Sequence, residues 1–192
     1  MKKKILLVMF LIFSIIFTGC IEEIKENGEK LVTAPLNTLG FKSDDLPSNY
    51  TTQSEFFNNT EISDNLSTGK TVIALERYNA FYGINATLTP SLTILMTKYD
   101  SIDSASAVFS EYNIFFFNND SSGDMYKRVS AEQIGDESAV GVLTSGEYSD
   151  AHQIIFRRLN IVTRFYTTFN ITQNESIDYA KVLINYIESS LS

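Results

Sequence analysis

The sequence predicts a single domain of the α+β class, an antiparallel β-sheet flanked by helices in the order strands, helix, strands, helix. Three observations favour this class. Several short segments are rich in β-branched and aromatic residues, two segments repeat apolar residues at helical spacing, and turn-forming stretches join consecutive strands. Strands joined by short turns make an antiparallel sheet, and the helices must cover at least one of its faces. Hydrophobic residues form 44% of the chain, which is typical of a packed core.

Three strands are expected in the first half of the domain. Residues 51–57 and 71–82 are rich in β-branched and aromatic residues and are predicted to be strands. The stretch between them, residues 58–69, is mostly polar and is predicted to be a loop. Residues 91–99 alternate, and this period of two predicts a half-buried strand with three residues on one face: Leu92, Ile94 and Met96.

A helix is predicted to follow, with a cap at Ser101 or Asp103 and an end at the polar residues 118–124. Its apolar residues recur at spacings of three and four and form one stripe: Ile102, Ala105, Phe109, Tyr112 and Phe116. Two short strands are expected next, at residues 125–129 and 139–143, on either side of a turn at residues 134–137.

Residues 151–169 predict a β-hairpin whose two-residue turn is Leu159-Asn160. This register sets three pairs opposite each other: Arg158 with Ile161, Phe156 with Thr163, and Ile154 with Phe165. One face then carries four apolar residues, and we expect it to meet the core: Ile154, Phe156, Ile161 and Phe165. The opposite, wetter face is expected to carry Arg157, Val162 and Arg164.

The last element is predicted to be an amphipathic helix over residues 175–191. Asn174 is the expected cap, and Glu175 suits the positive end of the helix dipole. Five apolar residues form the stripe that we expect to be buried: Ile177, Ala180, Ile184, Ile187 and Leu191.

The N-terminal residues have the parts of a secretory signal. Lys2, Lys3 and Lys4 precede fourteen uncharged, mostly apolar residues, which are too few for the roughly 20 that a membrane-spanning helix needs. The tripeptide before Cys20, Phe17-Thr18-Gly19, resembles the lipobox of prokaryotic lipoproteins, although Phe stands where Leu is usual. The resemblance implies cleavage before Cys20 and a diacylglycerol thioether on its sulfur, so that acyl chains anchor the protein. An uncleaved anchor and ordinary secretion are the alternatives.

The expected domains are a signal peptide at residues 1–19, a lipidated Cys20 with a flexible tether at residues 20–35, and a globular domain at residues 36–192. The whole chain has a net charge of −8, and cleavage would remove three lysines and no acid, which leaves 12 − 23 = −11. Such an acidic chain should not bind nucleic acid. Cys20 is the sole cysteine, so the mature domain is expected to have no disulfide and no thiolate site.

Seven Asn-X-Ser/Thr sequons are candidates for glycosylation, and such sites belong on the surface of secreted chains. With a lipobox nearby, they favour an archaeal cell surface, with a bacterial source left open; an Asn-rich composition alone is the other explanation. The sequons start at Asn49, Asn58, Asn65, Asn85, Asn119, Asn170 and Asn174.

Residues that could carry chemistry are few, and no catalytic, cofactor-binding or metal-binding residue is predicted. His152, the only histidine, lacks a nucleophile motif and is interpreted as structural. Residues 118–129 resemble an EF-hand loop, but Val129 stands where the bidentate Glu should be, so a plain loop is expected. Five basic residues are expected to pair with carboxylates, with an anion-binding spot as the alternative: Lys127, Arg128, Arg157, Arg158 and Arg164.

The run Phe115-Phe116-Phe117 can bury only part of itself in one helix stripe. The remainder is expected to dock on a neighbouring loop, and a surface for a partner is the alternative.

Four short motifs, in this order along the chain, resemble a diffuse group of small prokaryotic lipoproteins: "DDLPSNY", "IGDE", "IIFRRLNIV" and the closing helix. Their domains are similar to the PsbP-type α/β/α fold, and the likeness covers about residues 36–192. The "FRRLN" stretch departs from such sequences, which more often have Gly before Asn. The resemblance implies an antiparallel sheet flanked by helices and an accessory or interaction role.

These observations together predict a lipid-anchored binding or accessory module on the outer face of the cell membrane, without catalytic activity. Its partners would be the membrane, through the lipid on Cys20, and an unknown envelope protein or small ligand. Two alternatives stay open: a carboxylate-based envelope hydrolase, which needs two acids facing each other in a cleft, and a substrate-capturing lipoprotein of a transporter. A pocket in the folded domain would favour a ligand, and a flat surface would favour protein contacts.

Overall fold

The computed structural model describes residues 30–84, 91–117, 126–143, 151–168 and 171–191. Its elements, in chain order, are the short 3₁₀ helices η1 (Leu36–Thr38) and η2 (Ser43–Asp45), the strands β1 (Tyr50–Asn58), β2 (Ile62–Asn65), β3 (Thr71–Ile84) and β4 (Leu92–Tyr99), helix α2 (Ile102–Phe117), strands β5 (Tyr126–Arg128), β6 (Glu137–Leu143), β7 (His152–Arg158) and β8 (Ile161–Thr167), and helix α3 (Gln173–Ser189).

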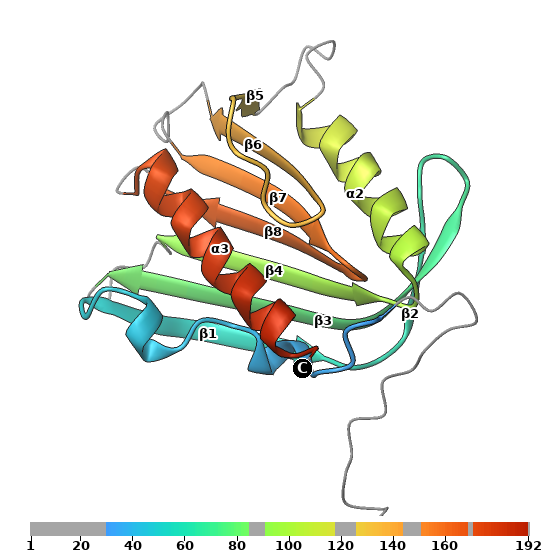
Figure 1. Ribbon diagram of the computed structural model, residues 1–192, viewed down its shortest axis with the longest axis horizontal. Helices are drawn as coiled ribbons and strands as arrows, with labels where there is room; N and C mark the ends of the chain where they lie inside the picture. Colours follow the sequence, from blue (N-terminus) through green and yellow to red (C-terminus); the bar gives the residue numbers. More distant parts are fainter. Residues whose placement is uncertain (1–29, 85–90, 118–125, 144–150, 169–170, 192) are drawn as a thin grey trace, which may run out of the picture.

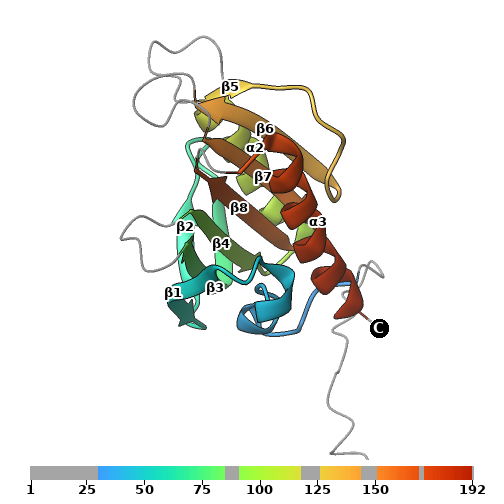
Figure 2. The same ribbon diagram turned by 90° about the vertical axis from the view of Figure 1, so that its left-hand side faces the viewer.

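The strands form one eight-stranded antiparallel sheet, which confirms the predicted α+β class. Seven strands follow the order β1-β3-β4-β8-β7-β6-β5, and β2 pairs with β3 outside this path. The two helices lie on opposite sides of the sheet, with α3 in front of it in Figure 1. Figure 2, turned by 90°, shows α3 on one side of the strands and α2 on the other.

The larger core lies between the sheet and α3, and the N-terminal residues 32–41 complete it. Alternate residues of β4, β7 and β8 point into this core because successive side chains of a strand face opposite ways. The predicted hairpin register is confirmed, since Phe156 lies opposite Thr163 and Ile154 opposite Phe165. The expected core face is also confirmed, because four side chains are fully buried there: Ile154, Phe156, Ile161 and Phe165.

The second core lies between the sheet and α2, on the face that the sequence predicted to be the wetter one. Val162 is 2% exposed there, and Ile155 is completely buried. The expectation fails for Val162 because the stripe of α2 must also be buried, and α2 packs against β7 and β8 on this side. At the far end of α2, Gly141 leaves room for Phe117, whose ring a Cβ would approach to 2.4 Å.

A bulge in β3 lets this strand serve both cores. Ala74 pairs with Tyr99 and Glu76 with Lys98, so Leu75 is an extra residue in the ladder. An extra residue changes which face the following side chains occupy. Val72 and Ala74, before the bulge, therefore belong to the α2 core, whereas the residues after it reach the α3 core: Tyr78, Ala80 and Tyr82.

Two further expectations about secondary structure need correction. The predicted loop at residues 58–69 contains strand β2, which pairs with β3. Helix α3 is capped by Thr172 instead of Asn174, because Thr172 Oγ1 accepts a hydrogen bond from the Glu175 amide while Glu175 accepts one from the Thr172 amide, as in a capping box. Helix α2 does begin at a predicted cap, since Ser101 Oγ accepts from the Ser104 amide at 3.1 Å.

The predicted tether at residues 20–35 overlaps the folded part of the chain. Val32 is 2% exposed, and its amide donates to Asn160 Oδ1 at 2.8 Å. Lys98 holds the same segment through the carbonyl oxygens of Thr33 and Ala34, at 3.3 and 3.2 Å. The fold therefore begins before residue 36, because these backbone groups find buried partners on the sheet.

Candidate functional site

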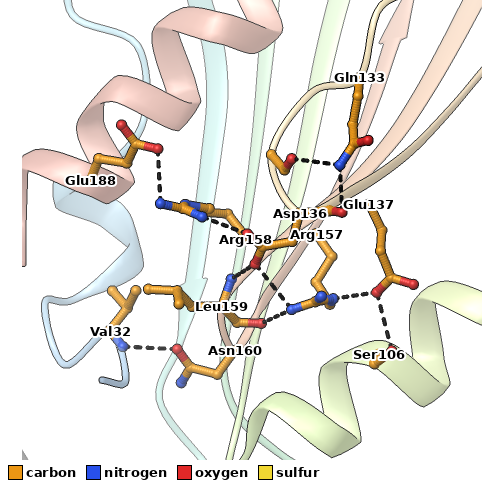
Figure 3. Close-up of polar contacts among 11 residues, drawn as sticks. Val32, Ser106, Gln133, Asp136, Glu137, Arg157, Arg158, Leu159, Asn160 and Glu188 are labelled. Atoms are coloured by element: carbon orange, nitrogen blue, oxygen red, sulfur yellow. Dashed lines mark hydrogen bonds and ion pairs between the residues drawn. The ribbon is translucent and has the colours of Figure 1, made fainter. Parts of the chain in front are cut away.

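Two of the sequence motifs meet at the β7–β8 turn and form a structural clamp (Figure 3). Asp136, from the turn before β6, accepts hydrogen bonds from the Leu159 amide at 2.7 Å and from Arg157 Nη1 at 3.1 Å, and it also pairs with Arg158. Burial alone would raise the pKa of Asp136. The Leu159 amide and the two arginines outweigh this effect and hold the pKa below its usual value.

The backbone of the clamp uses two residues with left-handed φ. Gly135 has φ of +66°, and a Cβ there would lie 2.5 Å from the Arg157 carbonyl oxygen, so the motif needs glycine at this point. Leu159 has φ of +52°, which side chains disfavour. A glycine would adopt such a φ without cost, and here the Asp136 carboxylate holds the Leu159 amide instead.

The clamp connects both helices and the N-terminal segment to the sheet. Glu137 pairs with Arg157 across the strands and accepts a hydrogen bond from Ser106 of α2 at 3.1 Å. Arg158 pairs with Glu188 of α3 at 3.0 Å. Asn160 accepts from the Val32 amide and donates to the Tyr99 carbonyl at 2.9 Å. Apart from the buried Nε of Arg158, these polar groups find partners within the clamp, so we assign the clamp to stability.

The five predicted basic residues consequently divide into groups with different surroundings. Arg157 and Arg158 pair with carboxylates, as expected. Arg128 pairs with the amide oxygen of Asn113 and lies over the Phe117 ring, and Lys127 is exposed on β5. Arg164 is on the α2 side of β8, where it meets aromatic rings in place of acids.

A pocket of about 440 Å³ opens beside α2, over the part of the sheet that this helix leaves uncovered. Its floor is formed by β3, β4 and β8, one wall by α2, and the other wall by the end of β2 and the turn after it. The lining residues are Asp64, Asn65, Leu66, Arg77, Asn79, Leu95, Thr97, Tyr99, Val108, Glu111, Tyr112, Val162 and Arg164.

The register of the strands explains why these side chains share one surface. Asn79, Leu95 and Arg164 lie directly opposite one another across β3, β4 and β8, and directly opposed residues of an antiparallel sheet point to the same face. Arg77, Thr97 and Val162 form the neighbouring row. Without the bulge at Leu75, the β3 members of both rows would point to the α3 core.

The wall formed by the end of β2 and the turn after it is fixed by two contacts between this turn and α2. The Glu111 carboxylate accepts hydrogen bonds from the amide and the hydroxyl of Ser67, at 2.8 and 3.2 Å. Lys70 Nζ donates to the Asp103 carbonyl at 3.2 Å. Asp64 is held by Arg77, whose Nη2 reaches both of its oxygens at 2.7 and 2.6 Å. These contacts give the pocket a defined shape.

Arg164 is the charged group of the pocket that lacks an acidic partner among the described residues. Its guanidinium lies 4.5 Å from the centre of the Phe116 ring, 5.0 Å from that of Tyr112 and 5.3 Å from that of Tyr166. It also donates to the Tyr166 hydroxyl, while its Nε is buried without a hydrogen-bond partner. Burial lowers the pKa of Arg164, an effect that Tyr112 opposes.

Tyr99 forms part of the same pocket and remains a neutral phenol. Burial, and then the neighbouring Tyr112, raise the pKa of Tyr99 well above its usual value. A neutral phenol adds a polar group without adding charge, so the charges of the pocket come from Arg77, Asp64, Arg164 and Glu111.

The other predicted site residues lie elsewhere. His152 is buried at the start of β7, opposite Thr167 of β8 and Val142 of β6. Phe116 and Phe117 are buried, but Phe115 remains 70% exposed, so its expected docking on a loop was wrong. Among the sequons, Asn49, Asn65 and Asn174 are exposed, Asn58 is half-buried at the end of β1, and Asn65 borders the pocket.

Several predicted sites lie outside the described residues: Cys20, the sequons at Asn85, Asn119 and Asn170, and most of the EF-hand-like loop. Within the described parts of the chain, no helix is long and apolar enough to cross a membrane. The same residues contain no group of three or more His, Cys, Asp or Glu side chains that could hold a metal ion.

No family model, curated protein or solved structure matches this chain.

Sequence reasoning missed most of the pocket. It named Arg164 but assigned it to a wet surface, and it placed Asp64, Asn65 and Leu66 in a loop. The available signal was the polar character of alternate positions in two predicted strands, Arg77 and Asn79 in one and Thr93 and Thr97 in the other. A strand that is polar on one face of a sheet covered by helices indicates a surface left open.

Proposed function

We propose that this protein is a binding module held on the outer face of the cell membrane by lipid on Cys20, and that its ligand occupies the pocket beside α2. The observation that carries the binding role is a shaped pocket whose floor bears Arg164, a half-buried guanidinium with no acid beside it in the described structure. A volume of about 440 Å³ is within the range of small-molecule sites. The PsbP-type likeness remains a prediction.

The pocket favours a ligand over a purely flat contact surface. A charged group that has lost part of its hydration is destabilising unless a partner restores the lost interactions, so a half-buried cation without an acidic partner indicates where a partner belongs. The other arginines of the β7–β8 hairpin have their acids within the fold. Arg164 therefore differs from them in what it can still offer to a ligand.

The anchor would keep the pocket near the membrane. Cys20 precedes Lys30, the first described residue, by ten positions, and ten extended residues span at most about 35 Å. Residues 31–34 are fixed to the sheet, which leaves only the preceding segment as a tether. A module with this short reach would meet ligands or partners close to the lipid surface, which fits an accessory role.

One observation supports the alternative of a carboxylate-based hydrolase. Asp64 and Glu111 line the same pocket, so two acids do share a cleft. Both carboxylates already accept hydrogen bonds that fix the walls, Asp64 from Arg77 and Glu111 from Ser67. A general acid must donate a proton, and these roles as acceptors favour binding over proton transfer. Glycosidase activity that is lost in both Asp64→Asn and Glu111→Gln would reverse this preference.

Two measurements on protein extracted from its native membranes test the proposal. Intact mass spectrometry should show a chain that begins at Cys20 and carries a diacylglycerol group, whereas a chain that begins at Met1 with a free thiol contradicts the anchor. Native mass spectrometry should show a bound small molecule, and the variant Arg164→Met should lose it. A ligand retained equally by Arg164→Met would remove the pocket from the proposal.

A further inference from the structure

The charges that line the pocket leave one cation and one anion without an oppositely charged partner. Arg77 and Asp64 neutralise each other at 2.6 Å. Of the remaining two, Arg164 forms no salt bridge with any described residue, and neither does Glu111. Glu111 uses one oxygen, Oε2, for both contacts with Ser67. Its other oxygen forms no hydrogen bond within the described part of the chain.

Building on the proposed function, we infer that the pocket binds a small zwitterion with an apolar body, such as an apolar amino acid. The carboxylate would bind Arg164, and the ammonium group would bind the free oxygen of Glu111. The body would lie on the apolar side chains that line the same pocket: Leu66, Leu95, Val108 and Val162.

The aromatic surroundings of Arg164 suit a carboxylate. The rings of Tyr112, Phe116 and Tyr166 hold the guanidinium by cation–π contacts and exclude water from part of it. None of these rings supplies a negative charge. The planar guanidinium matches a carboxylate through paired hydrogen bonds, and such charge-assisted bonds are stronger where water is excluded.

The charge of the whole protein favours a ligand without net charge. The chain has a net charge of −8, so a simple anion would be repelled as it approaches. A simple anion would also provide a partner for Arg164 only and would leave Glu111 without one. A zwitterion has no net charge to be repelled, and its ammonium group gives Glu111 the partner that it lacks.

Isothermal titration calorimetry of the full-length chain in mild detergent at pH 7 tests the inference with three matched probes. L-phenylalanine carries both charges, 3-phenylpropionate only the carboxylate, and 2-phenylethylamine only the ammonium group. We expect L-phenylalanine to bind at least tenfold more tightly than either of the others. Equal or tighter binding of 3-phenylpropionate overturns the zwitterion, and so does the absence of binding by all three.

Two variants locate the charges. Arg164→Met should lower the affinity for L-phenylalanine and for 3-phenylpropionate at least tenfold. Glu111→Gln, which can keep the contacts with Ser67, should weaken only L-phenylalanine, down to the level of 3-phenylpropionate. Arg128→Met is the matched control, because Arg128 lies outside the pocket, and it should change neither affinity. Unchanged binding of L-phenylalanine in Glu111→Gln overturns the inference even if Arg164→Met fails to fold.

The titrations can contradict the zwitterion without contradicting the proposed function. Binding of 3-phenylpropionate that depends on Arg164 but gains nothing from an ammonium group would overturn the zwitterion and retain the pocket. Loss of the lipid anchor or of a natural ligand at the pocket would be seen in the mass measurements on native protein, which use none of these probes.

Discussion

The two faces of the sheet are built from the same strands but differ in how completely they are covered. On the α3 face, the helix and the N-terminal segment cover an almost wholly apolar surface. On the α2 face, the helix packs over β7 and β8, and polar side chains of β3 and β4 line a pocket beside it. Successive side chains of a strand point to opposite faces of the sheet. The residues on one face can therefore be packed for stability, while those on the other face retain the unpaired groups that binding needs.

The largest expected effect comes from breaking the ion pair that fastens the N-terminal segment to the closed face. Lys98 and Glu76, with side chains 5% and 16% exposed, lie 2.5 Å apart. Lys98→Ala leaves Glu76 buried without its cation, and we expect a loss of about 4 kcal/mol in the free energy of unfolding. Urea denaturation measures this loss. The double variant Lys98→Met/Glu76→Gln should recover most of the lost stability. If it does not, the loss in Lys98→Ala comes mainly from packing and not from the unpaired carboxylate.

A pair of neighbouring residues in β4 compares the two faces directly. Ile94 is completely buried on the α3 face, whereas Leu95 is half-buried in the pocket. Ile94→Ala should cost about 3 kcal/mol because it leaves a cavity in the core. Leu95→Ala should cost about 1 kcal/mol, since less apolar surface is lost from contact. Equal losses in thermal and urea unfolding would mean that the pocket face is as tightly packed as the core.

The clamp at Asp136 predicts a dependence of stability on pH. The pKa of Asp136 is lower in the folded protein than its usual value of 3.8, so its stabilising effect is complete above pH 4 and is lost as the pH falls through the folded-state pKa. Asp136→Asn should reduce stability by about 2 kcal/mol at pH 7. The difference from the wild type should be constant from pH 7 to 5 and shrink below pH 4. A difference that grows in acid would contradict the assignment.

A similarly small effect is expected at the junction of η2 with α3. The Tyr186 hydroxyl donates to both oxygens of Asp45, at 2.7 and 2.8 Å. Tyr186→Phe should lower the free energy of unfolding by about 1 kcal/mol. It should leave ligand binding unchanged, because this contact lies on the face away from the pocket. Altered affinity in calorimetry would show that the two faces are coupled.

The sequence was sufficient to predict the elements whose apolar residues recur at regular spacing. The hairpin of β7 and β8 was predicted to the exact pairing because a two-residue turn and a buried face allow only one register. Strand β2 was missed because four residues with three polar side chains carry no clear period. The cap at Thr172 competed with Asn174, two residues away, and only the reciprocal bond from Glu175 decides between them.

The polar positions could indicate an open surface, but the lining and shape of the pocket could not be predicted because they depend on a bulge and on tertiary contacts. One extra residue at Leu75 turns Arg77 and Asn79 toward α2, and no residue type in "ALERY" marks a bulge. The wall depends on Glu111 meeting Ser67, 44 positions away in the chain. The sequence likewise predicted the same role, pairing with carboxylates, for Arg157, Arg158 and Arg164. Their places across the sheet differ, so Arg157 and Arg158 pair with acids, whereas Arg164 lines the pocket without one among the described residues.

The attachment of residues 32–34 to the middle of the sheet has a mechanical consequence. The segment is bound to Asn160, at the turn that leads into β8, and to Lys98 of β4. These two strands are neighbours at the centre of the strand order, with other strands on both sides. A pull on the N-terminal end would therefore load central strands, which must shear along whole ladders, instead of peeling away an edge strand one hydrogen bond at a time.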